Sequence, residues 1–343
     1  VTGVQTCALP IWAYRPFWYS TAVPIPKGFR YLKEIEAKNS EELAISQLKG
    51  IKLFLWYAIL NFFLLTLNAV FHGDKNTLRN WIAFEIPLPT MQDLFKLQSE
   101  GKNAPFYSFW LAAASTFFLD ALFRGVQVHL AVSMVRMAGY NALRGMYKPF
   151  SANSIHEFYN RYSYYFKEVL VHTFFYPTYF TCFKKQKKLR LFFAIFMAAG
   201  VGNFLLHFLS ETGYITNDGF FTHFRNFHVY WFHVTILSLG IYVSQNRNSG
   251  KKDAPRKGAL PRAIASTGSM ILFYIFLTVF DVSRANVPRG LSLYDHFRYL
   301  GAMFGVNYWF LISAPKLFFI DFPIRIQRHF GNFDKNLRRH VFG

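Results

Sequence analysis

The chain is short of charge, of acidic residues and of cysteine. Only 16% of its 343 residues are charged, whereas about 25% are charged in an average soluble domain, so an ordinary soluble globular protein is not expected. Its 18 acidic residues are outnumbered by 38 Lys and Arg. The two cysteines, Cys7 and Cys182, are too few for a disulfide framework or a multi-cysteine metal site. We therefore expect no metal site.

Apolar residues take the place of the missing charge. The chain is 52% hydrophobic and 20% aromatic, and several stretches approach the ~20 apolar residues that cross a bilayer. We predict an all-α, polytopic membrane helical bundle, with about seven or more spans or re-entrant helices in the lipid bilayer. The net charge of +20 could indicate nucleic-acid binding. The basic residues gather between apolar segments, however, as cytoplasmic loops do, and form no aromatic-interleaved stripe. No nucleic-acid partner is expected.

The first eleven residues, VTGVQTCALPI, resemble the translation of a sequencing-library adapter. We expect residues 1–11 to be artefactual and set them aside. On this interpretation, residues 12–343 form a single membrane domain that is truncated upstream, and the native chain begins at or near Trp12. Cys182 is then its only cysteine.

The apolar segments are distributed along the whole chain. Residues 106–140 are interrupted by four titratable side chains and form either one long tilted helix or two short ones. Residues 148–167 combine charge with aromatics and predict a helix at the membrane interface. Residues 169–183 contain Pro177, which favours a kinked or re-entrant segment. The other expected spans are residues 51–71, 191–210, 227–243, 263–282 and 299–317.

Three basic runs give the C-terminal half a consistent orientation. They occupy residues 184–190, residues 247–262 and the C-terminal tail, and two expected spans separate each run from the next. Because Lys and Arg favour the cytoplasmic side, all three runs are predicted to face the cytoplasm. The orientation of the N-terminal half stays open, since the number of spans in residues 106–140 is undecided.

One histidine lies inside a membrane-length apolar stretch. Among residues 191–210, His207 is the only titratable side chain. Asn203 lies four residues earlier and Ser210 three residues later, so a helix places all three on one face. Ionisable groups in hydrocarbon usually face a bundle interior or a water-filled cavity and mark functional sites. A buried, neutral imidazole suits a general base; the plainer alternative is a histidine that only links helices by hydrogen bonds.

Motifs in a fixed order carry a resemblance to a known family. They are Lys148-Pro149-Phe150 with Glu157 to Ser163, Gly202 to His207, Trp231-Phe232-His233, and Phe280 to Ala285 with Met303-Phe304-Gly305. This order resembles the membrane-bound O-acyltransferase (MBOAT) superfamily, in particular the bacterial branch with the alginate O-acetyltransferase and teichoic-acid D-alanyl transfer proteins. The resemblance covers a core of residues 148–305, about half of the chain.

The resemblance implies an enzyme that moves an acyl group from a thioester to a hydroxyl of an envelope glycan, polysaccharide or lipid, as in O-acetylation. It implies acyl-CoA or an acidic acyl-carrier protein as donor, drawn to the basic loops, and no bound cofactor. The resemblance also implies a periplasmic partner and a location in the bacterial inner membrane. The implied site residues are His207 as general base, Asn203 as its orienting or polarising neighbour, and Ser163, Asn160, Arg161 and His233 in substrate binding.

The chain also departs from the family pattern. Ser163 stands where the family has a histidine or an asparagine. A catalytically inactive relative is therefore an alternative, and a transporter or channel, with the polar stripe lining its path, is another. Paired half-helices or an internal repeat would favour a transporter, and the sequence shows neither. Tyrosines replace family tryptophans at positions 159 and 162, and the second polar residue of the site could instead be Asn160, His156 or His172.

Overall fold

The computed structural model describes residues 28–73, 86–249, 259–283 and 287–306. Helices make up 78% of these residues, which contain no β-strand, so the predicted all-α class is confirmed for them. The segment 1–11 lies outside the described residues. In chain order the helices are α2 (Gly28–Ile35), α3 (Ser40–His72), α4 (Met91–Ser99), α5 (Phe106–Met137), η3 (Pro149–Ser151), α6 (Ile155–Tyr162), α7 (Tyr164–Leu170), η4 (Val171–Phe175), α8 (Tyr176–Thr181), α9 (Lys187–Ile195), η5 (Phe196–Gly202), α10 (Asn203–Ser210), α11 (Thr212–Asp218), α12 (Phe220–Asn226), α13 (Val229–Ser249), α14 (Ala259–Thr278) and α15 (Leu293–Met303).

Three helices are long and apolar enough to cross a membrane, and they indicate an integral membrane protein. They are α3, α5 and the continuous helix Lys187–Ser210, which joins α9, η5 and α10. A fourth span results if α12 and α13, which meet at a bend of 54°, are counted together. In α14 the apolar stretch is shorter, Ile264–Thr278. The expected count of seven or more spans is not confirmed within the described ranges.

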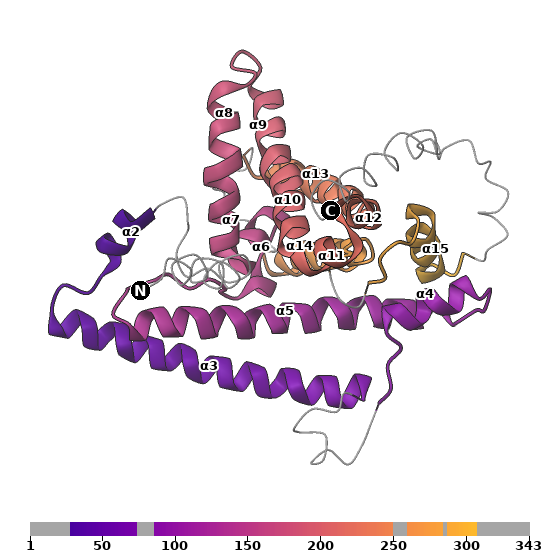
Figure 1. The fold of residues 1–343 in the computed structure, drawn as a ribbon, viewed down its shortest axis with the longest axis horizontal. Helices are drawn as coiled ribbons and strands as arrows, with labels where there is room; N and C mark the ends of the chain where they lie inside the picture. The colour runs from indigo at the N-terminus through magenta and orange to yellow at the C-terminus, as the bar shows by residue number, and fades with distance from the viewer. Residues whose placement is uncertain (1–27, 74–85, 250–258, 284–286, 307–343) are drawn as a thin grey trace, which may run out of the picture.

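Helices α3 and α5 form a long antiparallel pair along one side of the molecule (Figure 1). The segment 106–140, which could have been one helix or two, is a single helix. The Ser46 hydroxyl donates to the Arg136 carbonyl and ties the start of α3 to the end of α5. A Cβ on Gly50 would lie only 3.0 Å from the Ser133 carbonyl oxygen and 2.9 Å from the Met137 side chain. Glycine is therefore what allows the two backbones to approach so closely.

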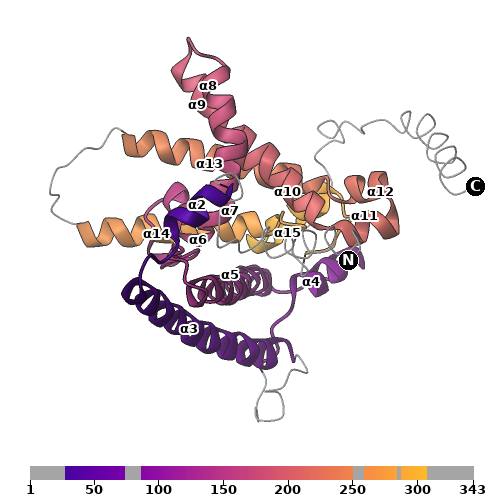
Figure 2. The ribbon, with the colours of Figure 1, turned by 60° about the vertical axis from the view of Figure 1, so that its left-hand side comes forward.

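A helical hairpin projects away from this pair (Figures 1 and 2). Its first arm is α7–η4–α8 and its second arm is α9–η5–α10. Each arm contains a π-helical turn, and the two turns, η4 and η5, pack against each other. A Cβ on Gly202 would lie 2.6 Å from the Phe174 ring. Pro177 is the second residue of α8, directly after η4, and the arm is helical on both sides of it.

The main core lies between α4, α5, α10, α13, α14 and α15, and aromatic rings fill much of it. The rings of Phe204 and Trp231 stack with centroids 3.9 Å apart, which joins α10 to α13. The Ser292 hydroxyl and the Asp295 carboxylate cap the start of α15 by accepting from each other's backbone N–H. Of the expected span 299–317, the described part ends at residue 306, just after α15. The packed core holds the inner end of the hairpin against α13 and α14, and this is where the candidate site lies.

Candidate functional site

A small cavity lies where α5, α6, α7, α10, α13 and α14 meet, with a volume of about 60 Å³. Aromatic rings make up much of its wall: three come from α6, and α7, α13 and α14 supply one Phe or Tyr each. Four of the six predicted site residues line this one cavity: Asn203 and His207 from α10, His233 from α13, and Ser163 from the break between α6 and α7. The polar residues of the lining are Arg124, Ser163, Asn203, His207, His233, Thr278 and Asp281.

Asn203 and His207 occupy successive turns at the start of α10, so their side chains reach the cavity from the same helix face. The His207 ring packs edge-on against Phe166 and tilted against Tyr230, with centroid distances of 5.5 and 5.4 Å. Asn203 is only 2% exposed, and its side-chain oxygen accepts from the Tyr230 hydroxyl at 3.5 Å. The Tyr230 contact therefore orients the amide beside the imidazole. Ser210, the third residue of the predicted stripe, donates to the His207 carbonyl of its own helix.

The ring of His233 enters the same cavity from α13. Its Nδ1 lies 3.0 Å from the Leu277 carbonyl oxygen. Because a carbonyl oxygen can only accept, Nδ1 carries the hydrogen, and Nε2 is the nitrogen that can accept a proton. The imidazole stacks on Tyr230 with centroids 4.9 Å apart and planes 11° apart. Tyr230 thus contacts both cavity histidines and fixes the plane of one of them.

Ser163 lines the cavity from the short break between α6 and α7. Its φ of −147° and ψ of 69° end one helix and start the next. A hydroxyl at this position can donate one hydrogen bond and accept two, but it cannot act as a base at neutral pH. Ser163, which stands where the family has a histidine or an asparagine, therefore lines the cavity but offers a hydroxyl in place of an imidazole or an amide.

Two charged residues of the lining were not among the predicted site residues. Arg124 lies on α5, and its Nε is 3.3 Å from the Asp120 carboxylate one turn earlier; Tyr162 donates to the same carboxylate at 3.1 Å. Asp281 follows α14, is only 4% exposed and accepts from the Ser283 hydroxyl. The sequence signal was present, because Asp120 and Arg124 interrupt an apolar run four residues apart, the spacing of an intrahelical ion pair.

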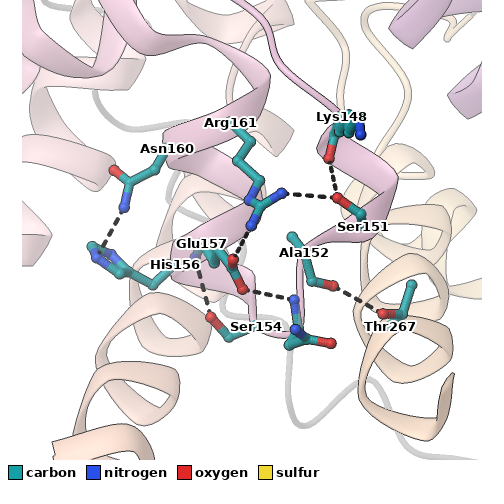
Figure 3. A network of polar contacts seen from close by, with 10 residues as sticks. Lys148, Ser151, Ala152, Ser154, His156, Glu157, Asn160, Arg161 and Thr267 are labelled. Atoms are coloured by element: carbon teal, nitrogen blue, oxygen red, sulfur yellow. Dashed lines mark hydrogen bonds and ion pairs between the residues drawn. The ribbon is translucent and has the colours of Figure 1, made fainter. Parts of the chain in front are cut away.

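Asn160 and Arg161 lie on α6 but outside this cavity (Figure 3). The Arg161 guanidinium donates to the Ser151 hydroxyl at 2.8 Å and pairs with Glu157 of its own helix. Arg161 is therefore not in the lining of this cavity, and its charge joins α6 to η3. Asn160 points the other way from the same helix, and its amide lies 3.1 Å from Nε2 of His156.

Asn160 belongs to a second cavity, on the other side of Tyr159, which lines both. Its polar residues are His156, Asn160, Lys167 and Gln245. The His156 imidazole lies between two amides, because Nδ1 is 3.0 Å from Gln245. Burial lowers the pKa of His156, and the nearby Lys167 lowers it further. Glu157 opposes this shift, and the two amides hold the ring in place.

No family model, curated protein or solved structure matches this chain. The similarity to the MBOAT superfamily stays a prediction that rests on the motifs in residues 148–305. What the site can do is judged from its own geometry.

A buried carboxylate lies at the C-terminal end of the helix that carries His207. Glu211 follows α10, and its carboxylate lies 2.7 Å from Arg289 Nη2 and 3.5 Å from His223 Nε2. Arg289 also donates to the carbonyl of Val282, next to Asp281 of the cavity. Burial raises the pKa of Glu211 to about 7, Arg289 opposes the rise, and Asp281 adds to it. The cluster joins the end of α10 to the loop that follows α14.

Proposed function

We propose that this protein is a membrane acyltransferase that moves an acyl group from a thioester to a hydroxyl, with His207 as the general base. One observation carries the proposal: His207 and Asn203 share a cavity with Ser163 and His233, as the sequence motifs lead one to expect. The proposal includes the MBOAT-like fold, with about seven or more spans or re-entrant helices, and a place in the inner membrane of a bacterium.

The transfer needs a base, an oxyanion donor and protection from water. The neutral imidazole of His207 takes the proton of the acceptor hydroxyl while that oxygen attacks the thioester carbonyl. The C–S bond then breaks, and the leaving sulfur receives the proton from the imidazolium. Asn203, whose oxygen accepts from Tyr230, presents its NH₂ group as a donor for the oxyanion. The aromatic wall of the cavity keeps water from hydrolysing the thioester.

The second cavity supports a route for the donor. It adjoins the catalytic cavity at Tyr159 and is lined by Lys167 from α7 and by Ile195 from α9, the helix whose first turns carry basic residues. A thioester from acyl-CoA or an acidic carrier protein would enter on this side, with its acyl end toward His207. The acceptor, a hydroxyl of an envelope glycan, polysaccharide or lipid, would approach from the end near Glu211, where a periplasmic partner would also bind.

A transporter or channel is the second candidate, and a specific observation favours it. Arg124 and Asp281 place opposite charges on the wall of a cavity inside a helical membrane bundle, and charges at such sites often line permeation paths. A catalytically inactive relative is the third candidate, because Ser163 lacks the basic or amide group expected there.

Transfer of a labelled acyl group from a thioester in membranes separates these candidates. His207→Ala should lower the transfer rate by about 10²–10⁴-fold, the usual contribution of a general base. His228→Ala is the matched control, since His228 is exposed and bonds only to its own helix turn in the described structure; it should leave the rate unchanged. Equal rates for His207→Ala and the parent chain would exclude the mechanism, and no transfer by the parent would favour the other candidates.

A further inference from the structure

The tip of the hairpin, which we define as residues 176–190, extends beyond the other helices (Figures 1 and 2). It comprises α8, the turn and the first residues of α9. Neither cavity is lined by the tip, so the transfer step itself does not use it, although its basic residues on α9 lie on the side proposed for donor entry. Its exposed side chains have a distinctive chemistry of two kinds.

Large aromatic rings are exposed at the tip. Tyr176, Phe180 and Phe183 are 42%, 65% and 45% exposed. Tyr176 and Phe180 lie one turn apart on α8 and stack with centroids 6.1 Å apart. Phe183 adopts a positive φ of 49°, a backbone conformation that is unusual for a bulky residue. The turn thus places a third ring at the extremity, where it touches only Phe193 among the described aromatic residues.

Five cations surround these rings. They are Lys184, Lys185, Lys187, Lys188 and Arg190, and no acidic residue occurs between Glu168 and Glu211. The four lysines are exposed and form no ion pair with any described residue. Arg190 lies over the Tyr179 ring, 4.3 Å from its centroid. The tip therefore presents an uncompensated positive charge together with an aromatic surface.

We infer that the tip binds the anionic phospholipid headgroups on the cytoplasmic side of the membrane. The lysines would pair with headgroup phosphates, and the three exposed rings would lie at the boundary between headgroups and acyl chains, where aromatic side chains are enriched. Charge alone would also suit an acidic protein. The exposed Phe180 and Phe183 favour lipid. Moving their rings from water into the membrane boundary is favourable by itself, whereas an acidic protein would need a matching apolar surface.

The inference shares the α9 lysines with the proposed donor route, but its test reads lipid contact directly and needs no acyl transfer. Cys182 in the tip is a natural site for a reporter. A Cys7→Ser chain would be labelled at Cys182 with an environment-sensitive fluorophore and placed in nanodiscs of zwitterionic lipid with increasing phosphatidylglycerol. We expect a blue-shifted emission that spin-labelled lipids quench, and that strengthens with the anionic fraction and weakens with salt.

Two variants that each lose four positive charges, one at the tip and one elsewhere, test the inference. Neutralising the four tip lysines to glutamine should weaken the preference for anionic lipid by roughly fivefold per lysine removed. The same four-charge change at exposed lysines elsewhere, Lys33, Lys38, Lys49 and Lys52, should leave the Cys182 signal unchanged, and thermal unfolding of both variants shows whether they fold. Emission that stays water-like in every lipid, or that changes only when a soluble acidic protein is added, would overturn the inference.

Discussion

Replacing Gly202 by alanine should disturb the contact between the two π turns and, through it, the helix that carries Asn203 and His207. The new Cβ would lie 2.6 Å from the Phe174 ring, roughly 1 Å inside the ordinary carbon contact of 3.5–4.0 Å. Such overpacking costs about 1–3 kcal/mol, and alanine returns about 1 kcal/mol of helix propensity over glycine. We therefore expect a net loss of up to about 2 kcal/mol in the free energy of unfolding.

The same displacement should lower acyl transfer, because a 1 Å misplacement of a reacting group costs up to ~10²-fold in rate. Thermal unfolding of the purified protein and the labelled-thioester assay measure the two effects. Gly268→Ala on α14 is the control, since its Cβ would meet nothing within 4 Å. Phe174→Leu should restore part of the lost stability when combined with Gly202→Ala. A Gly202→Ala protein that unfolds like Gly268→Ala, with no coupling to position 174, would refute the reasoning.

Three further substitutions test the surroundings of the site. His233→Phe keeps the stack on Tyr230 but removes Nε2 together with the Nδ1–H hydrogen bond to the Leu277 carbonyl. The transfer rate should fall by about tenfold or more if Nε2 binds the acceptor; an unchanged rate would show that neither ring nitrogen is needed for transfer. The pKa of Glu211 rises from 4.5 to about 7, so the folded state holds a proton that the unfolded state has lost, and stability should fall as pH increases between these values. Glu211→Gln should flatten that slope in thermal unfolding; equal slopes would contradict the assignment. Arg124→Met removes the ion-pair partner of Asp120, which keeps its hydrogen bond from Tyr162. It should cost about 1–3 kcal/mol, most of which Asp120→Asn should restore in the double variant.

The catalytic candidate could be located from the sequence because its signal is local. A single titratable side chain in a long apolar stretch indicates His207, and helical spacing adds Asn203. Residues of α5 and α14 reach the same cavity only through tertiary packing. The sequence shows Arg124 and Asp281 as charges in or beside apolar runs, and it does not indicate which face of the bundle they line.

The sequence could not distinguish the roles of residues that are adjacent in the chain. Asn160 and Arg161 occupy one short helix, where successive side chains point about 100° apart, so a motif cannot tell which of them faces a substrate. The π turns were not predicted either. They depend on the contact of Phe174 with Gly202 across the hairpin, and neither arm alone carries that information.

The π turn before Asn203 has a consequence for how one helix can contact two different neighbours. A π turn holds more residues than an α turn, so one extra residue shifts every later side chain by about 100° around the axis. Residues on α9 and residues on α10 can thus be aimed in directions that an unbroken α-helix could not combine. The direction in which the His207 imidazole points therefore depends on the number of residues in the π turn, 196–202, as well as on the side chains that contact the ring. Losing a single residue from that turn would swing the ring away while the apolar composition stayed the same.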